Sequence, residues 1–245
     1  MRTHINQAIK ILYQDPEIVA IHKPPGLMVH RSRIDPHASE FALQRTRDQI
    51  GQLVFPIHRL DRPTSGVLLF ALNQETARDL AKQFETRRVK KTYHAIVRGF
   101  VDSGIWDEPL LEKPDRISDQ NARPNKPPQP AVTQYEGLRR WEIPLSTGKY
   151  PNSRYSLVKI QPRTGRRHQI RRHFNHMGHP IIGDTSHGDR RHNHLFREQL
   201  GIKRLLLVAS SLKISHPTTA EEILIAIDFA GEFSDPIRIL NSKAK

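Results

Sequence analysis

The 245-residue sequence contains no cysteine. Disulfides, thiolate nucleophiles, and zinc or iron–sulfur sites with cysteine ligands are therefore excluded. The sequence also has no apolar run long enough to span a membrane, and its first residues, MRTHINQAIK, contain no apolar signal core. From these absences we expect a soluble, cytoplasmic protein that has no membrane partner.

Acidic residues are in the minority. The chain has 39 Lys and Arg against 25 Asp and Glu, which gives a formal net charge of +14 and a pI near 10.3. Each phosphate that a protein neutralises releases condensed counterions, so this excess favours a phosphate-rich partner such as a nucleic acid. A scattered basic surface without a ligand is the alternative, and the charge alone does not decide between the two.

Short apolar runs recur along the chain, and most contain β-branched or aromatic residues and are bounded by Gly, Pro, Asp or Asn. Such runs are typical of strands. The predicted strands cover residues 17–22, 67–72, 93–100, 131–138, 155–162, 204–215 and 222–229. Helical patterns are fewer and cover residues 39–51, 73–89 and 164–180. The few regular β–α alternations indicate an α+β fold with a mainly antiparallel sheet.

The stretch KPDRISDQNARPNKPPQP, residues 113–130, has five prolines and little apolar content. We expect a flexible surface loop, either without a role or as an arm that becomes ordered on a large ligand. Strand-like patterns on both sides of it belong to one sheet, which argues against a linker between domains. Residues 1–245 are therefore expected to form a single domain.

The third predicted helix is strongly basic. It is expected to begin at Thr164 and to end at Gly178 and Pro180. At 3.6 residues per turn, Ile170, Phe174 and Met177 fall on one stripe that faces the core. The opposite half carries Arg167, His168, Arg171, Arg172 and Asn175. A solvated basic face is one interpretation, but so many guanidinium groups favour binding of phosphate or carboxylate.

Several familiar kinds of site do not fit the sequence. Seven histidines lie between residues 168 and 194, but no HExxH occurs and the surrounding arginines repel divalent cations, so we predict no metal. Ser65 has no GxSxG context, and no phosphate-binding glycine loop is present. Asp61, in HRLDRPTSG, lacks the second nearby carboxylate of a glycosidase, and Asp184 and Asp189 could equally be turn residues. Any chemistry must then depend on one carboxylate among cations.

The motifs resemble those of a known family. KPPG (23–26), HRLDRPTSG (58–66), KTYHAIVRG (91–99), TGRRHQIRRHFNHMGHPIIGD (164–184) and RLLLVASSLKISHP (204–217) resemble, in this order, the motifs of the RluA-type pseudouridine synthases. The series covers about residues 10–230. QPAVTQYEGL (129–138) and TGKYPNSRYSLV (147–158) resemble the branch that modifies uridine-65 of tRNA. An N-terminal S4 RNA-binding domain, common in the family, is not expected here.

The resemblance implies a pseudouridine synthase fold with a mixed, mainly antiparallel central sheet flanked by helices and loops. It also implies an isomerisation without cofactor, in which the glycosidic bond breaks, the uracil rotates and its C5 joins C1′ of the same ribose. Asp61 resembles the essential aspartate, which acts at the ribose by attack at C1′ or by removing the 2′ proton. Tyr93 resembles the tyrosine that stacks on the uracil, and Arg171 the arginine that pairs with the aspartate.

Further residues are assigned to the substrate. Arg59 resembles the residue that fills the place of the flipped uridine, since extrusion of a base costs roughly a few kcal/mol and requires a wedge. Arg167, His168 and Arg172 are expected to bind the RNA. Lys23 and Pro24 are expected to have a structural role in a turn, and Val208 replaces a histidine that is common in the family.

We therefore expect a monomeric tRNA pseudouridine synthase. A synthase that acts on ribosomal RNA, an RNA-binding protein without activity, and a glycosylase that excises the base remain as alternatives. A silent binder would leave the RNA unmodified, and a glycosylase would leave an abasic site.

Overall fold

The computed structural model describes residues 8–30, 40–111 and 127–244. Most of the loop predicted at 113–130 lies outside these residues, as does Ser39, the first residue of the predicted helix 39–51. The chain divides into two compact units: Met1–Val89 with Ser211–Ile227, and Lys90–Ser210 with Asp228–Lys245. Within the described ranges, no helix has the length and hydropathy needed to cross a membrane.

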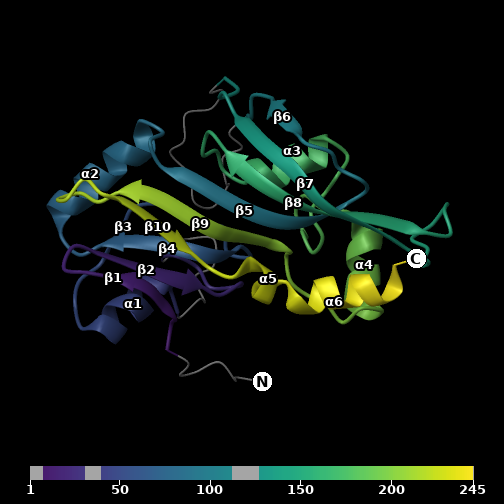
Figure 1. Ribbon diagram of the computed structural model, residues 1–245, viewed down its shortest axis with the longest axis horizontal. Helices are drawn as coiled ribbons and strands as arrows, with labels where there is room; N and C mark the ends of the chain where they lie inside the picture. The colour runs from purple at the N-terminus through teal and green to yellow at the C-terminus, as the bar shows by residue number, and fades with distance from the viewer. Residues whose placement is uncertain (1–7, 31–39, 112–126, 245) are drawn as a thin grey trace. The chain divides into compact units, whose positions relative to one another are not determined.

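The first unit is a sheet with two helices. Its strands are β1 (Ile11–Gln14), β2 (Ile18–Lys23), β3 (Phe55–Pro56), β4 (Ser65–Ala71), the C-terminal part of β9 (Leu207–Ser215) and β10 (Glu222–Ala226). The order is β1-β2-β4-β9, with β3 paired to β4 and β10 to β9 (Figure 1). The helices are α1 (Ala42–Ile50) and α2 (Gln74–Glu85), and Leu80 of α2 packs on Leu69 of β4 in the core.

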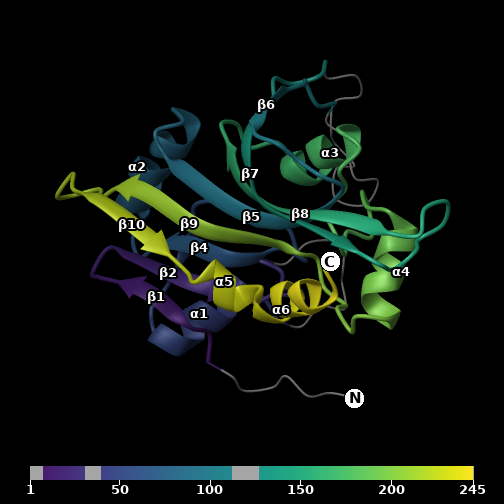
Figure 2. The same cartoon turned by 45° about the vertical axis from the view of Figure 1, so that its right-hand side comes forward.

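The second unit is also a sheet covered by helices. Its strands are the N-terminal part of β9, β5 (Lys90–Arg98), β8 (Ser153–Pro162), β7 (Val132–Ile143) and β6 (Gly104–Asp107), in this order across the sheet. Its helices are α3 (Gln169–His176), α4 (Arg190–Glu198), α5 (Phe229–Glu232) and α6 (Ser234–Lys243). Both views show α3 beside β7 and β8 (Figures 1 and 2), where its apolar stripe enters the core.

The sequence predicted the sheet well. Each predicted strand has a counterpart, and the pairings of β5 with β8 and of β8 with β7 are antiparallel, as are those of β2 with β1 and β4. The α+β prediction is therefore confirmed. β10 is shorter than predicted because Asp228 caps a new helix: its side chain accepts a hydrogen bond from the amide of Ala230.

The helices were predicted less well. α1 ends at Gly51, as expected, in a left-handed conformation with φ 67° that favours glycine. α2 begins at the cap Asn73 but ends at Glu85 rather than near residue 89. The helix predicted from Thr164 begins only at Gln169, and α4 and α6 were not predicted.

Candidate functional site

The loop that carries Asp61 is fixed on both sides. His58 Nε2 accepts a hydrogen bond from the amide of Leu69 on β4 at 3.1 Å, and its ring stacks on Phe84 of α2 with centroids 5.0 Å apart. Leu60 is buried, while the Asp61 carbonyl accepts the amide of Thr64 at 3.0 Å. The motif therefore holds a half-buried Asp61 in a defined turn beside β4.

Lys23 joins this loop to the KPPG turn. The side chain is completely buried, and its Nζ donates to the carbonyls of Pro24 at 3.0 Å, Leu27 at 2.8 Å and Arg62 at 3.2 Å. Burial lowers the pKa of Lys23 to about 7, against the attraction of the Asp61 carboxylate, which raises it. Lys23 thus lies in the KPPG turn, where a structural role was expected, and it also bonds to Arg62, the residue that follows Asp61 in the sequence.

The KPPG turn makes a second connection to the same loop. The amide of Gly26 donates to the Arg62 carbonyl at 2.9 Å, and Arg62 Nε donates to the Gly26 carbonyl at 3.1 Å. Gly26 has φ 86°, a value that favours glycine. Two short motifs that are far apart in the sequence therefore form one structural element around Asp61.

In the second unit, residues 164–168, predicted as the first turn of helix α3, are not helical and are held instead by the side chain of Gln169. Thr164 is buried and its hydroxyl donates to Gln169 Oε1 at 2.7 Å, which also accepts the amide of Arg166 at 3.0 Å. Gln169 Nε2 donates to the Val132 carbonyl at 3.0 Å. The prediction that the helix starts at Thr164 is wrong because the Gln169 amide holds residues 164–168 in a turn.

His168 precedes α3 in a left-handed conformation with φ 53°, uncommon for a residue other than glycine. Its Nδ1 lies 2.9 Å from Nε2 of His187, so the two rings share one hydrogen bond. Strained backbone persists where the surroundings fix it and is frequent at functional sites. The hydrogen bond to His187 therefore fixes the orientation of the His168 ring, directly before the first residue of α3.

Arg171 was expected on the exposed half of α3, but it is buried. Its Nε donates to Asp184 Oδ2 at 2.7 Å and its Nη2 to Asp184 Oδ1 at 2.8 Å. Burial raises the pKa of Asp184, but the hydrogen bonds and charge of Arg171 outweigh it, together with the amides of His187 and Ser186, and hold that pKa below its ordinary value. The helix face prediction is wrong here because a partner thirteen residues later draws the guanidinium inward.

The other site residues predicted in this unit lie on β5, in the turn before α3 and on α3. Tyr93, on β5, is half-buried and packs against the cluster that contains Ile170 and Phe174. Arg172 Nη1 donates to the Leu111 carbonyl at 2.9 Å, and Arg167 is half-buried. The second unit thus gathers Tyr93, Arg171, Arg167, His168 and Arg172, whereas Arg59 and Asp61 belong to the first unit.

Sequence reasoning missed three contributors. Lys23 was assigned to a turn without its carbonyl partners, Asp184 was not distinguished from a turn residue, and His187 was not linked to His168. The helix pattern gave no signal for Asp184, because it placed Arg171 on the exposed half, where a guanidinium needs no acid partner. Asp189, the other acid considered there, caps α4 by accepting the amide of Arg191 at 2.9 Å.

The histidines of this region have protein partners. His173 is buried, with Nδ1 at 2.9 Å from the Thr133 hydroxyl and Nε2 at 3.1 Å from the Glu108 carbonyl. His192 Nδ1 lies 2.9 Å from the Tyr155 hydroxyl. No group of three or more His, Cys, Asp or Glu in the part of the chain that the structure describes has an arrangement that could hold a metal ion.

Comparison with known proteins gives a consistent result. Residues 17–176 match the family model described as RNA pseudouridylate synthase. The chain is 51% identical over 218 residues to the "tRNA pseudouridine synthase C" of Vibrio cholerae, covering 89% of both chains. It is 53% identical over 218 residues to that of Salmonella typhi, covering 89% of this chain and 84% of the relative. With that of Pasteurella multocida it shares 50% over 234 residues, which cover 95% of this chain and 96% of the relative.

Solved structures agree with the fold. "Human RNA Pseudouridylate Synthase Domain Containing 4" superposes with a TM-score of 0.69 at 26% identity, covering 95% of this chain and 93% of that chain. "Human RNA Pseudouridylate Synthase Domain Containing 1" superposes with a TM-score of 0.70 at 24% identity, covering 96% of this chain and 89% of that chain. At that lower identity, the second likeness concerns the fold alone.

Proposed function

This chain belongs to the RNA pseudouridylate synthase family, and we propose that its substrate is tRNA, in which it isomerises uridine-65 of the T stem to pseudouridine. The observation that carries the choice of tRNA is the identity of about half of all residues to three tRNA pseudouridine synthases C, over most of each chain. The net charge of +14 supports a polyanionic substrate.

We propose that Asp61 is the reacting carboxylate. In the isomerisation the bond between C1′ and N1 breaks, the uracil rotates, a bond forms between C5 and C1′, and the C5 hydrogen is lost while N1 gains a proton. Asp61 acts at the ribose, by attack at C1′ or by removing the 2′ proton. The buried Leu60 and the Lys23 contacts support this role, because a reacting group must be held in position.

The other predicted site residues are proposed to bind the substrate or to support Asp61. We propose that Tyr93 stacks on the flipped uracil, that Arg59 fills the space that the base leaves, and that Arg171 provides positive charge to the Asp61 carboxylate. Arg167, His168 and Arg172 bind phosphates on either side of the target. The two hydrogen bonds to Asp184 fix the orientation of the Arg171 guanidinium in the first turn of α3.

The direct test is to map pseudouridine in total RNA, by carbodiimide labelling and primer extension, with and without the gene. We expect the stop at uridine-65 of tRNA to disappear without the gene and to return when purified protein is added to that tRNA. If uridine-65 stays modified and a ribosomal pseudouridine disappears, the tRNA assignment fails while the reaction class survives. Strand cleavage at an abasic site would instead indicate a glycosylase, and unchanged RNA a silent binder.

Binding of tRNA should weaken steeply with salt. Each neutralised phosphate contributes about 0.7–0.9 to the slope of log affinity against log salt concentration. We expect contacts to at least about three phosphates, because cations greatly outnumber acids and several surround the start of α3. A filter-binding titration between low and physiological salt measures the slope. A flat plot would show that the basic surface does not dock the RNA.

A further inference from the structure

A pocket of about 560 Å³ lies between α4 and the loop that joins β7 to β8. Its walls are formed by Ser146, Thr147, Gly148, Arg190, Arg191, His194, Leu195 and Gln199. None of these residues belongs to the site proposed for the reaction. Volumes of about 300–1,000 Å³ are usual for ligand sites, so the pocket has room for a phosphate with its flanking sugars.

The charge of the lining is one-sided. Arg190, Arg191 and His194 contribute cationic or titratable groups, and the lining contains no Asp or Glu. Arg190 and Arg191 are exposed, and no carboxylate within the described residues pairs with either side chain. A guanidinium group without a carboxylate partner, beside hydroxyl groups, is suited to an oxyanion such as phosphate.

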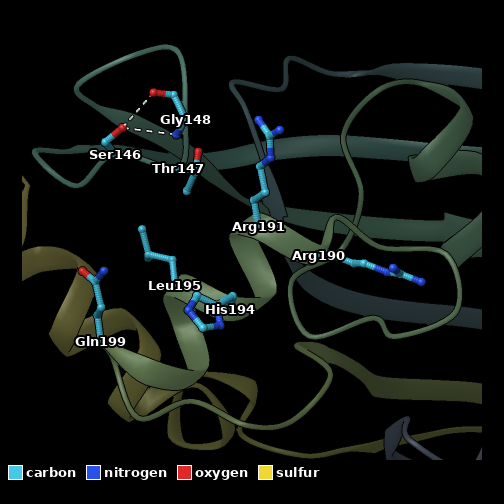
Figure 3. A pocket seen from close by; sticks show the side chains of 8 residues that line it. All are labelled: Ser146, Thr147, Gly148, Arg190, Arg191, His194, Leu195 and Gln199. Carbon is cyan, nitrogen blue, oxygen red and sulfur yellow. Dashed lines mark hydrogen bonds between the residues drawn. The ribbon is translucent and has the colours of Figure 1, made fainter.

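Figure 3 shows how the cations are directed. Arg191 extends from the first turn of α4 toward the loop, while Arg190 points away from the loop. A Cβ atom on Gly148 would lie 2.8 Å from Arg191 Nη1, so the absence of a side chain at Gly148 leaves the space that the guanidinium occupies. The loop backbone and Arg191 therefore form one wall of the pocket.

The pocket is held rigidly. His192 lies 3.2 Å from the Thr147 hydroxyl through Nε2 and packs edge-on against Tyr155 of β8. Burial lowers the pKa of His192, against the attraction of the Asp189 carboxylate, which raises it. Leu195, which also lines the pocket, and Phe196 are buried and anchor the helix in the core. The His192 hydrogen bond therefore joins the helix to the loop at the edge of the pocket.

The same helix is tied to the Arg171 pair. Asn193 Nδ2 donates to the Asp184 carbonyl at 2.8 Å, and Asn193 Oδ1 accepts the amide of Gly183 at 2.7 Å. The pocket therefore has a defined position relative to the start of α3, within one compact unit.

The rim favours a nucleic acid over a free ion. Tyr150 is 67% exposed, and Lys149 Nζ lies 5.5 Å from the centroid of its ring. An exposed aromatic ring beside a basic groove offers a surface on which an unpaired base stacks. A free phosphate ion would use neither the ring nor most of the volume.

From these observations, and resting on the proposed function, we propose that this pocket is a second anchor for the substrate RNA. Arg191 binds a backbone phosphate of the tRNA at a distance from the reacting uridine. The pocket contributes to affinity for the whole tRNA and takes no part in the chemical step.

The test compares Arg191→Gln with Arg197→Gln. Both substitutions remove one charge from an exposed position of α4, but Arg197 lies outside the pocket and pairs with Glu198 at 2.6 Å. For Arg191→Gln on full-length tRNA we expect KM to rise about 5- to 10-fold, kcat to stay within about twofold, and the salt slope to fall by about 1. Arg197→Gln should match the wild type in all three.

Equal KM values for the two variants would overturn the anchor, because net charge alone would then explain the binding. A fall in kcat with unchanged KM would also overturn it, since the pocket would then act on the reaction itself. If the wild type modifies no tRNA, the proposed function fails; if the wild type is active and Arg191→Gln binds tRNA equally well, only the anchor fails.

Discussion

Replacing Asp61 by Asn is expected to abolish isomerisation while RNA binding is retained. Asparagine keeps the shape of the side chain but cannot attack C1′ or accept the 2′ proton, so turnover should fall by at least about 10³-fold. Release of tritium from tRNA that contains 5-³H-uridine measures it. Binding should stay within about threefold of the wild type, because an acid is not a ligand for phosphate.

Asp48→Asn is a suitable control for this experiment. Asp48 is in the same compact unit, its side chain is 65% exposed, and it pairs only locally with Arg47 on α1. It should retain full turnover. Turnover of Asp61→Asn near that of the control would remove Asp61 from the reaction, and joint loss of binding and turnover would assign it to docking or to folding.

The second large effect is expected on stability. Asp184→Asn removes the carboxylate that pairs with the buried guanidinium of Arg171, and removal of one partner of a buried pair costs about 3–5 kcal/mol. We expect urea denaturation to report a loss of this size. Asp235→Asn, in an ion pair with both side chains more than 70% exposed, should change the free energy of unfolding by less than about 1 kcal/mol.

A double replacement separates structure from activity. Arg171→Met combined with Asp184→Asn removes both charges, and the asparagine oxygen can still accept the amides of Ser186 and His187. Removal of both charges of a buried pair costs far less than removal of one. The double variant should regain most of the lost stability and remain inactive if Arg171 has the proposed role. Regained activity would show that the pair serves the fold alone.

Acid titration checks the sign of the Asp184 contribution. Because the pKa of Asp184 is lowered in the folded protein, its stabilisation is fully present above the unfolded value of about 3.9 and is lost as pH falls through the folded pKa. The difference in stability between wild type and Asp184→Asn should therefore shrink below about pH 4. A difference that stays constant in acid would contradict this assignment.

Local patterns predicted the strands because the apolar residues of each strand form a short contiguous run in the sequence. The same logic found Asn73 and Gly51 at helix ends, since caps are local. The start of α3 was predicted wrongly because it depends on a hydrogen bond from Gln169 to Val132, which lies on a strand far away in the sequence. Helix α4 was not predicted because its segment is highly polar and buries only Leu195 and Phe196, too few residues to give a helical apolar pattern.

The candidate site also has a part that the sequence could predict and a part that it could not. Asp61, Tyr93 and Arg171 were proposed from motifs, which record residue types in order along the chain. Their supporting contacts join residues far apart in sequence: Lys23 with Arg62, and Arg171 with Asp184. No periodicity in the sequence encodes such pairs, so the turn assigned to Lys23 and the exposed face assigned to Arg171 were incomplete or wrong.

The buried Lys23 ammonium has a consequence for local motion. It bonds to carbonyls of Pro24 and Leu27 on one segment and of Arg62 on another. Neither segment can separate from the amine without leaving a buried polar group unpaired, which costs about 1–3 kcal/mol. The KPPG turn and the Asp61 loop therefore open together, as one cooperative unit whose amide protons exchange with solvent at a common rate.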